Sequence, residues 1–283
     1  MPELSEIEYS RDACVQAVRD YYHFLTQMYL DDTDFVYPPD DDENGWPTIN
    51  DENLADVDKD ETVLDLLRHL PYVRQNPDDG GSDAIQVAPF TTITDWAADA
   101  ALIADGSYDG ESLKTATEGG TLCDVIPPHV VGLTAGPRDN NIFLVDTELG
   151  IVLWPECPGE VVKASRRSPL LPSSVRPVSD DPYDYEDDEE QAEWRGDSTA
   201  WSIPHFFEML KDQFRTLEFV PITKTTVWVT HPYFHAQDAE VIVPAVREIY
   251  RKHHWPDLEQ YDKAACQAEI QAYLRGNYPR FVE

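Results

Sequence analysis

The chain has 283 residues, of which 55 are acidic and 21 are basic, so its formal net charge is −34 at pH 7. Apolar residues make up 41% of it and aromatic residues 11%, which excludes a wholly disordered chain. A field of this sign repels nucleic-acid backbones and anionic lipid, so we expect no nucleic-acid or membrane partner. Two interpretations of the charge stay open: it keeps the protein soluble, or it attracts a basic protein partner.

The sequence favours an intracellular protein. Its first residues, MPELSEIEYSRD, lack the basic start and apolar stretch of a secretory signal, and no later stretch approaches 18 uninterrupted apolar residues. Four widely spaced cysteines suggest neither a disulfide framework nor a zinc knuckle. We expect a cytoplasmic location, with the nucleus as an alternative, and one domain over residues 1–283.

Apolar spacing predicts two helices in the N-terminal third. Apolar residues recur at steps of three and four over residues 10–30 and again over residues 60–70. Ser10 or Asp12 is suited to cap the first helix, and Pro71 stops the second. The acidic, proline-containing stretch between them predicts a loop.

The β signal lies in the middle of the chain. Residues 85–96, IQVAPFTTITDW, predict a strand or a strand pair, and a short helix is expected over residues 96–104. The apolar runs 142–145 and 151–154 flank a turn and predict a hairpin. We expect an antiparallel meander over residues 125–163 to form the core of the sheet.

Residues 163–197 have a different composition. The stretch begins rich in Ser, Pro and Arg, and it carries eight carboxylates between Asp180 and Glu190. Such repulsion disfavours compaction, so we expect a mobile inserted loop, or a linker, whose basic half can fold back on acidic surface.

The C-terminal third returns to regular patterns. An aromatic stripe at helical spacing predicts a helix over residues 203–217, with Ser198 or Thr199 as its cap. Residues 225–229 predict a strand, and residues 241–254 and 261–276 predict two final helices. The expected fold is therefore α+β, with a central antiparallel sheet flanked by helices and two further helices at the C-terminal end.

No pattern identifies a reaction. GxSxG, GxGxxG and P-loop sequences are absent, and we expect no cofactor. The nearest approach to a metal site is His231, His235 and Glu240, with Asp238 beside them. The alternative is that these histidines form loop hydrogen bonds or contact a partner. An enzyme with a pocket or metal site near these three residues is the second hypothesis for function.

The order of the central elements resembles the SUKH superfamily, the Smi1/Knr4-like proteins, over residues 61–217. The stretch IPPHVVGLTAGPRDNNIFLVDTELGIVLW contains two strands joined by an acidic and glycine-containing turn, Asp146 to Gly150, and it precedes a helix that carries Phe206, Phe207 and Leu210. The resemblance implies a binding module: fungal members act in cell-wall and signalling regulation, and bacterial members neutralise toxins. The long N-terminal helix, the acidic insertion and the C-terminal helices depart from the simplest members, which puts the partner in doubt.

The leading hypothesis is a non-enzymatic interaction or regulatory protein with an acidic binding surface. Carboxylates would steer a basic protein partner, and aromatic side chains would supply apolar contact. A third possibility is a nucleic-acid mimic with carboxylates spaced like phosphates. The residues expected to bind the partner are Trp154, Glu156 and Glu160 at the hairpin end and Asp184, Tyr185, Asp187 and Asp188 in the acidic loop.

Overall fold

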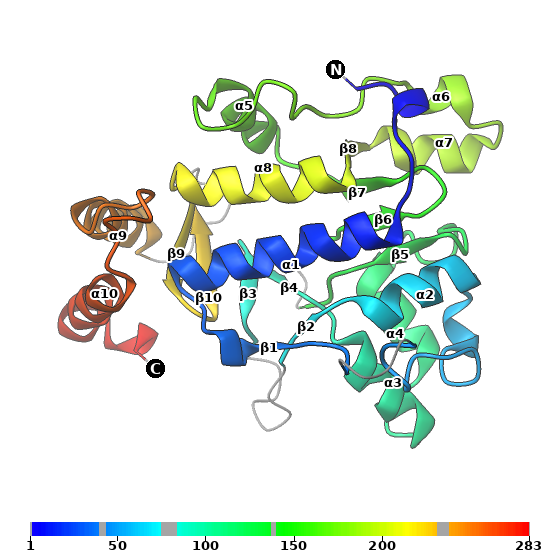
Figure 1. The fold of residues 1–283 in the computed structure, drawn as a ribbon, viewed down its shortest axis with the longest axis horizontal. Coiled ribbons are helices and arrows are strands. Elements are labelled where there is room, and N and C mark those ends of the chain that lie inside the picture. Colours follow the sequence, from blue (N-terminus) through cyan, green and yellow to red (C-terminus); the bar gives the residue numbers. More distant parts are fainter. Residues whose placement is uncertain (1, 40–43, 75–83, 137–139, 231–237, 283) are drawn as a thin grey trace.

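The computed structural model describes residues 2–39, 44–74, 84–136, 140–230 and 238–282, and it has the expected α+β fold (Figure 1). Its helices are α1 (Arg11–Met28), α2 (Glu61–His69), α3 (Trp96–Ala104), α4 (Gly110–Glu118), α5 (Gly159–Arg167), α6 (Pro182–Tyr185), α7 (Glu189–Gly196), α8 (Ile203–Arg215), α9 (Ala239–Lys252) and α10 (Lys263–Asn277). Short 3-10 turns are η1 (Leu4–Glu6), η2 (Asp32–Asp34), η3 (Ala55–Val57) and η5 (Pro279–Phe281).

The strands form four antiparallel sheets within these residues. Three sheets are pairs: β1 (Phe35–Val36) with β2 (Tyr72–Val73), β3 (Gln86–Ala88) with β4 (Thr91–Thr92), and β9 (Phe219–Thr223) with β10 (Thr226–Val229). The largest sheet has the order β5 (Val130–Gly132), β6 (Leu144–Asp146), β7 (Ile151–Pro155) and β8 (Ser198–Ser202).

The predicted hairpin is confirmed as β6 and β7, and β5 precedes it as expected. The meander does not continue to residue 163, because the chain enters α5 at Gly159. The fourth strand comes instead from β8, which pairs with β7 after a separation of more than 40 residues. Ser198 is therefore the start of a strand and not a helix cap; α8 begins after Ser202.

Successive residues of the large sheet point to opposite faces, as the period of a strand requires. One row across all four strands, Val131, Val145, Val152 and Trp201, faces the main core. The row beside it, with Leu144, Leu153 and Ala200, faces a second apolar cluster. Both faces of the sheet are thus covered.

The main core lies between the sheet and the helix pair α1 and α8, which run side by side (Figure 1). Both helices were predicted from their apolar spacing, and the Ser10 side chain accepts a hydrogen bond from the Ala13 N–H at the start of α1. Phe206 of α8 sits at the centre: its ring centroid lies 4.9 Å from that of Phe143 and 5.8 Å from that of Trp201. Such aromatic pairs add about 0.5–1.5 kcal/mol each beyond area burial.

The second face of the sheet is covered by α7 and by the N-terminal segment. Trp194 of α7 joins the second cluster, and Leu4 and Ile7 pack against it. This corrects the expectation of a loop or linker over residues 163–197, since that stretch contains α6, α7 and the end of α5, with Leu171 and Trp194 buried. Apolar burial on the sheet offsets the repulsion that composition alone suggested; the mobility of the segment stays a prediction.

The remaining elements flank this centre. The helices α2, α3, α9 and α10 and the strand pair β3 and β4 are confirmed close to their predicted bounds. The helix α4 and the strands β1, β2 and β9 were not predicted, and β1 lies in the acidic stretch that was expected to be a loop. Within the described residues, no helix combines the length and apolar character needed to cross a bilayer.

Candidate protein-interaction surface

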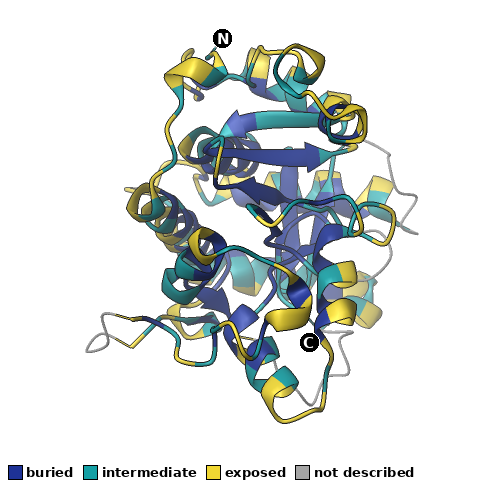
Figure 2. Cartoon of the chain, turned by 90° about the vertical axis from the view of Figure 1, so that its right-hand side faces the viewer, coloured by how far each residue is buried: buried dark blue, intermediate teal, exposed yellow. Residues whose placement is uncertain are grey.

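Exposed carboxylates gather over α6, α7 and η1, which meet at the N-terminal end of the molecule (Figure 1). Helices there carry many exposed residues, seen at the top of Figure 2. We call this region the acidic surface; its exposed carboxylates are Glu3, Glu6, Asp180, Asp181, Asp184, Asp187, Asp188, Glu189, Glu190, Glu193 and Asp197.

Two aspartates of the acidic surface also set its local structure. The Asp181 side chain accepts a hydrogen bond from the Tyr183 N–H and caps α6, where Pro182 occupies the first turn. The Asp188 side chain accepts one from the Gln191 N–H at 2.9 Å and caps α7. Acidic residues in the first turns are favoured by the helix dipole, which is why so charged a stretch folds as two helices.

The N-terminal segment is attached directly to this region. The Leu4 N–H donates to the Asp180 carboxylate at 2.9 Å, and the Ser179 N–H donates to the Pro2 carbonyl at 3.2 Å. These contacts bring Glu3 and Glu6 beside residues that lie about 176 positions later in the chain. Sequence reasoning did not place the N-terminal residues here.

A buried ion pair joins α7 to the sheet. Arg195 Nη1 donates to Asp146 Oδ2 at 2.7 Å, and the two side chains are 2% and 0% exposed. The other Asp146 oxygen accepts hydrogen bonds from the Glu148 and Leu149 N–H groups at 2.9 and 2.8 Å. Arg195 also lies 3.6 Å from the Glu186 carboxylate. Arg195 is the one cation among residues 178–197, and its charge is neutralised in the interior.

The aromatic residue that the acidic surface exposes is Tyr183, with 60% of its area accessible. The predicted Tyr185 is half-buried between α6 and the ion pair. Burial raises the pKa of Tyr185, while Arg195 acts in the opposite direction. The two tyrosines stand two positions apart in one short helix, so sequence could not tell which of them faces solvent.

The three residues predicted at the hairpin end have different surroundings. Trp154 is 2% exposed and its ring lies 5.0 Å from that of Phe143 in the main core, so its expected role as a contact for a partner is wrong. Glu156 is exposed, and its N–H donates to the Asp197 carbonyl, which places it at the end of α7. Glu160 lies apart on α5, where Lys163 Nζ is 3.5 Å away.

The remaining predicted residues belong to the acidic loop and to the proposed metal site. Asp184, Asp187 and Asp188 are exposed on the acidic surface, as their predicted role requires. His231 and His235 lie outside the described residues, and Glu240 is exposed in the first turn of α9. Across the described ranges, no group of three His, Cys, Asp or Glu side chains is arranged to hold a metal ion.

The fold and this surface define an α+β protein in which the acidic helix α7, with α6 packed against it, covers part of one face of a four-stranded antiparallel sheet. No protein-family model, no curated protein and no solved structure matches the chain. The resemblance to the SUKH superfamily stays a prediction.

Proposed function

We propose that this protein is a non-enzymatic interaction module that binds a basic protein through the acidic surface. The observation that carries the proposal is an exposed tyrosine, Tyr183, among exposed carboxylates, while Arg195, the one cation among residues 178–197, is buried in an ion pair. Carboxylates of this density raise the association rate of a positively charged partner. A tyrosine adds contact area with little loss of side-chain entropy.

The attachment of the surface to the sheet supports the same proposal. The Arg195–Asp146 pair and the burial of Trp194 hold α7 in place, so the carboxylates are presented on a fixed helix. A preorganised surface loses less entropy on binding than a disordered acidic tail.

Affinity purification from the native cells tests the proposal. The tagged protein is compared with a variant carrying Asp184→Asn, Asp187→Asn and Asp188→Asn, in which asparagine retains the capping of α7. We expect a basic protein to co-purify with the wild type at low salt and to be lost from the variant. Salt raised from about 0.05 M to about 0.5 M should release it as well, because screening shortens the range of the charges.

A matched control removes the same charge elsewhere. Asp51→Asn, Glu52→Gln and Glu111→Gln change three exposed carboxylates outside the acidic surface. If this control loses the partner as fully as the first variant, net charge and not the acidic surface is responsible, and the proposal fails.

Substitution of Tyr183 tests whether its side chain contacts the partner, independently of the carboxylates that raise the association rate. Tyr183→Ala should weaken binding by about 1–3 kcal/mol through faster dissociation, whereas Tyr183→Phe should retain most of the affinity. The measurement is surface plasmon resonance with the identified partner. Equal affinities for wild type and Tyr183→Ala would show that the side chain is not part of the interface.

A further inference from the structure

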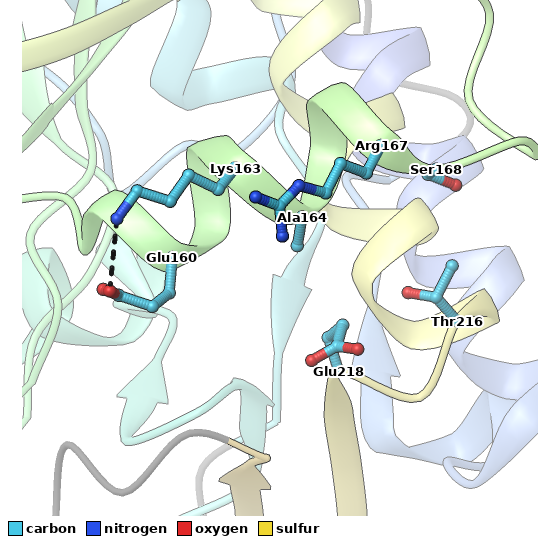
Figure 3. A pocket seen from close by; sticks show the side chains of 7 residues that line it. All are labelled: Glu160, Lys163, Ala164, Arg167, Ser168, Thr216 and Glu218. Atoms are coloured by element: carbon cyan, nitrogen blue, oxygen red, sulfur yellow. Dashed lines mark ion pairs between the residues drawn. The ribbon is translucent and has the colours of Figure 1, made fainter.

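A second region that could bind a ligand lies away from the acidic surface, between α5 and the turn that joins α8 to β9. It is a hollow of about 290 Å³ (Figure 3). The residues that line it are Glu160, Lys163, Ala164, Arg167, Ser168, Thr216 and Glu218. None of them belongs to the acidic surface, so ligand binding in this hollow is independent of the proposed function.

The charges in this hollow are of both signs. Lys163 is directed toward Glu160, with 3.5 Å between its Nζ and the nearer carboxylate oxygen, so these two largely neutralise each other (Figure 3). Arg167 extends along α5 on the side of Ala164. Within the described part of the chain, its guanidinium forms no ion pair, although carboxylates outnumber cations in this protein. Arg167 is therefore available to bind a carboxylate from outside.

The opposite side of the hollow favours positive charge. Glu218 lies below α5 in Figure 3, and its carboxylate is held by the Thr230 hydroxyl and by Arg247, whose Nη2 is 3.8 Å away. The helices α5 and α8 both end at the hollow, with Ser168 and Thr216 as their C-terminal caps. Carbonyl groups at helix C-termini carry partial negative charge, which adds to that of Glu218.

The wall between these two sides is fixed. The Ser168 hydroxyl donates to Asp212 Oδ1 at 2.7 Å, and the Asp212 residue is fully buried. The Thr216 hydroxyl donates to the Asp212 carbonyl at 2.9 Å, which joins the end of α8 to the same point. The ends of α5 and α8 are thereby held together.

We propose that this hollow binds a small zwitterion of the α-amino acid type, with its carboxylate on Arg167 and its ammonium group on Glu218. A simple anion would meet Glu218 and two helix C-termini, and a simple cation would meet Arg167. Only a ligand with both charges satisfies both sides. The volume is at the lower end of the range for small-molecule sites, about 300–1,000 Å³, which favours a small amino acid.

Isothermal titration of the purified full chain with three probes of similar size tests this proposal. L-Alanine carries both charges, propionate only the carboxylate and ethylamine only the ammonium group. We expect L-alanine to bind at least tenfold more tightly than either of the other two. Equal binding of propionate or ethylamine overturns the proposal. So does the absence of L-alanine binding up to about 10 mM, a concentration at which a ligand with a binding free energy of about −4 kcal/mol occupies more than half of the sites.

Two neighbouring arginines of α5 supply a matched pair of variants. Arg167→Gln should weaken L-alanine binding at least tenfold. Arg166→Gln removes the same charge from an exposed residue that does not line the hollow, and it should leave the affinity unchanged. If both variants weaken binding equally, the general field of the protein and not this site is responsible, and the assignment is wrong.

Discussion

Two buried ion pairs of the same kind have different surroundings in this protein. Lys59 and Glu118 approach to 2.6 Å with both side chains fully buried, and apart from Lys59 no described group donates a hydrogen bond to the Glu118 carboxylate. Arg195 and Asp146 approach to 2.7 Å, but there the Asp146 carboxylate also accepts two backbone hydrogen bonds. The two pairs therefore have similar separations but differ in the hydrogen bonds that their carboxylates accept.

This difference in hydrogen bonding is accompanied by shifts in the pKa values of Lys59 and Glu118. Burial raises the pKa of Glu118 to about 7 despite the opposing effect of Lys59, and burial also lowers the pKa of Lys59. Both groups are thus shifted toward their neutral forms, because loss of hydration outweighs their mutual attraction. A buried ion pair needs further hydrogen bonds to offset that loss. The Asp146 carboxylate accepts two from backbone N–H groups, whereas in the other pair the further bond is a long one, 3.5 Å from Lys59 Nζ to the Pro127 carbonyl.

Removal of one partner from the supported pair should have the largest effect. Arg195→Ala removes the guanidinium paired with the buried Asp146 carboxylate and frees the end of α7, so we expect a loss of about 3–5 kcal/mol in the free energy of unfolding. Urea denaturation measures it. Arg275→Ala, at an exposed position of α10, should stay within about 0.5 kcal/mol of wild type. A loss below about 1 kcal/mol for Arg195→Ala would contradict this account of the pair.

Replacement of both partners by apolar residues should change the stability differently for the two pairs. For Lys59→Met with Glu118→Leu we expect a neutral effect or a gain of about 1–4 kcal/mol, since the further hydrogen bond that is lost, from Lys59 Nζ to the Pro127 carbonyl, is long at 3.5 Å. For Asp146→Leu with Arg195→Met we expect a loss, because the Glu148 and Leu149 N–H groups are left without an acceptor, at about 1–3 kcal/mol each. The same change in stability for both double variants in urea denaturation would refute the comparison.

A third carboxyl, that of the half-buried Asp99, forms no ion pair within the described residues, and its substitution should have the smallest effect. Burial, with a contribution from Asp95, raises the pKa of Asp99 to about 7. Because the pKa is higher in the folded state, the stability from the neutral carboxyl is present below about pH 4 and is lost as the pH rises to about 7. Asp99→Asn should therefore match wild type near pH 4 and exceed it by about 1–3 kcal/mol near pH 8.

The control variant for this measurement should change the stability in the opposite direction. Hydrogen bonds from Ser107 lower the pKa of the exposed Asp105 carboxylate, so Asp105→Asn should lose a little stability above about pH 4. Urea denaturation near pH 4 and near pH 8 compares the two variants. A gain that is the same at both pH values would show that the Asp99 effect does not come from titration.

Local patterns predicted the elements whose apolar residues recur regularly. The helix α1 and the hairpin of β6 and β7 follow directly from such spacing. The helix α4 has few apolar residues, among them the buried Leu113, and starts at Gly110, while β9 contains Pro221, so neither has the usual signal of its class. Composition also misjudged residues 163–197, because the burial of Trp194 depends on a sheet face formed elsewhere in the chain.

The candidate site was predictable only in part for the same reason. Exposed carboxylates at Asp184, Asp187 and Asp188 follow from charge repulsion, which acts locally. The burial of Trp154 and the pairing of Arg195 with Asp146, 49 positions apart, depend on long-range packing that periodicity does not encode. A single sequence therefore indicates which charges a surface carries more readily than which residues belong to that surface.

The second face of the sheet has a consequence for hydrogen exchange. The layer that covers it is assembled from residues 2–8, 122–126 and 178–194, whereas the main core extends from Cys14 to Leu274. A small layer built from distant segments is the part that we expect to open as a unit before global unfolding. Amide protons of α7 and of the edge strand β8 should then exchange together, ahead of those in α1 and α8, and a bound partner should slow that exchange by favouring the closed form.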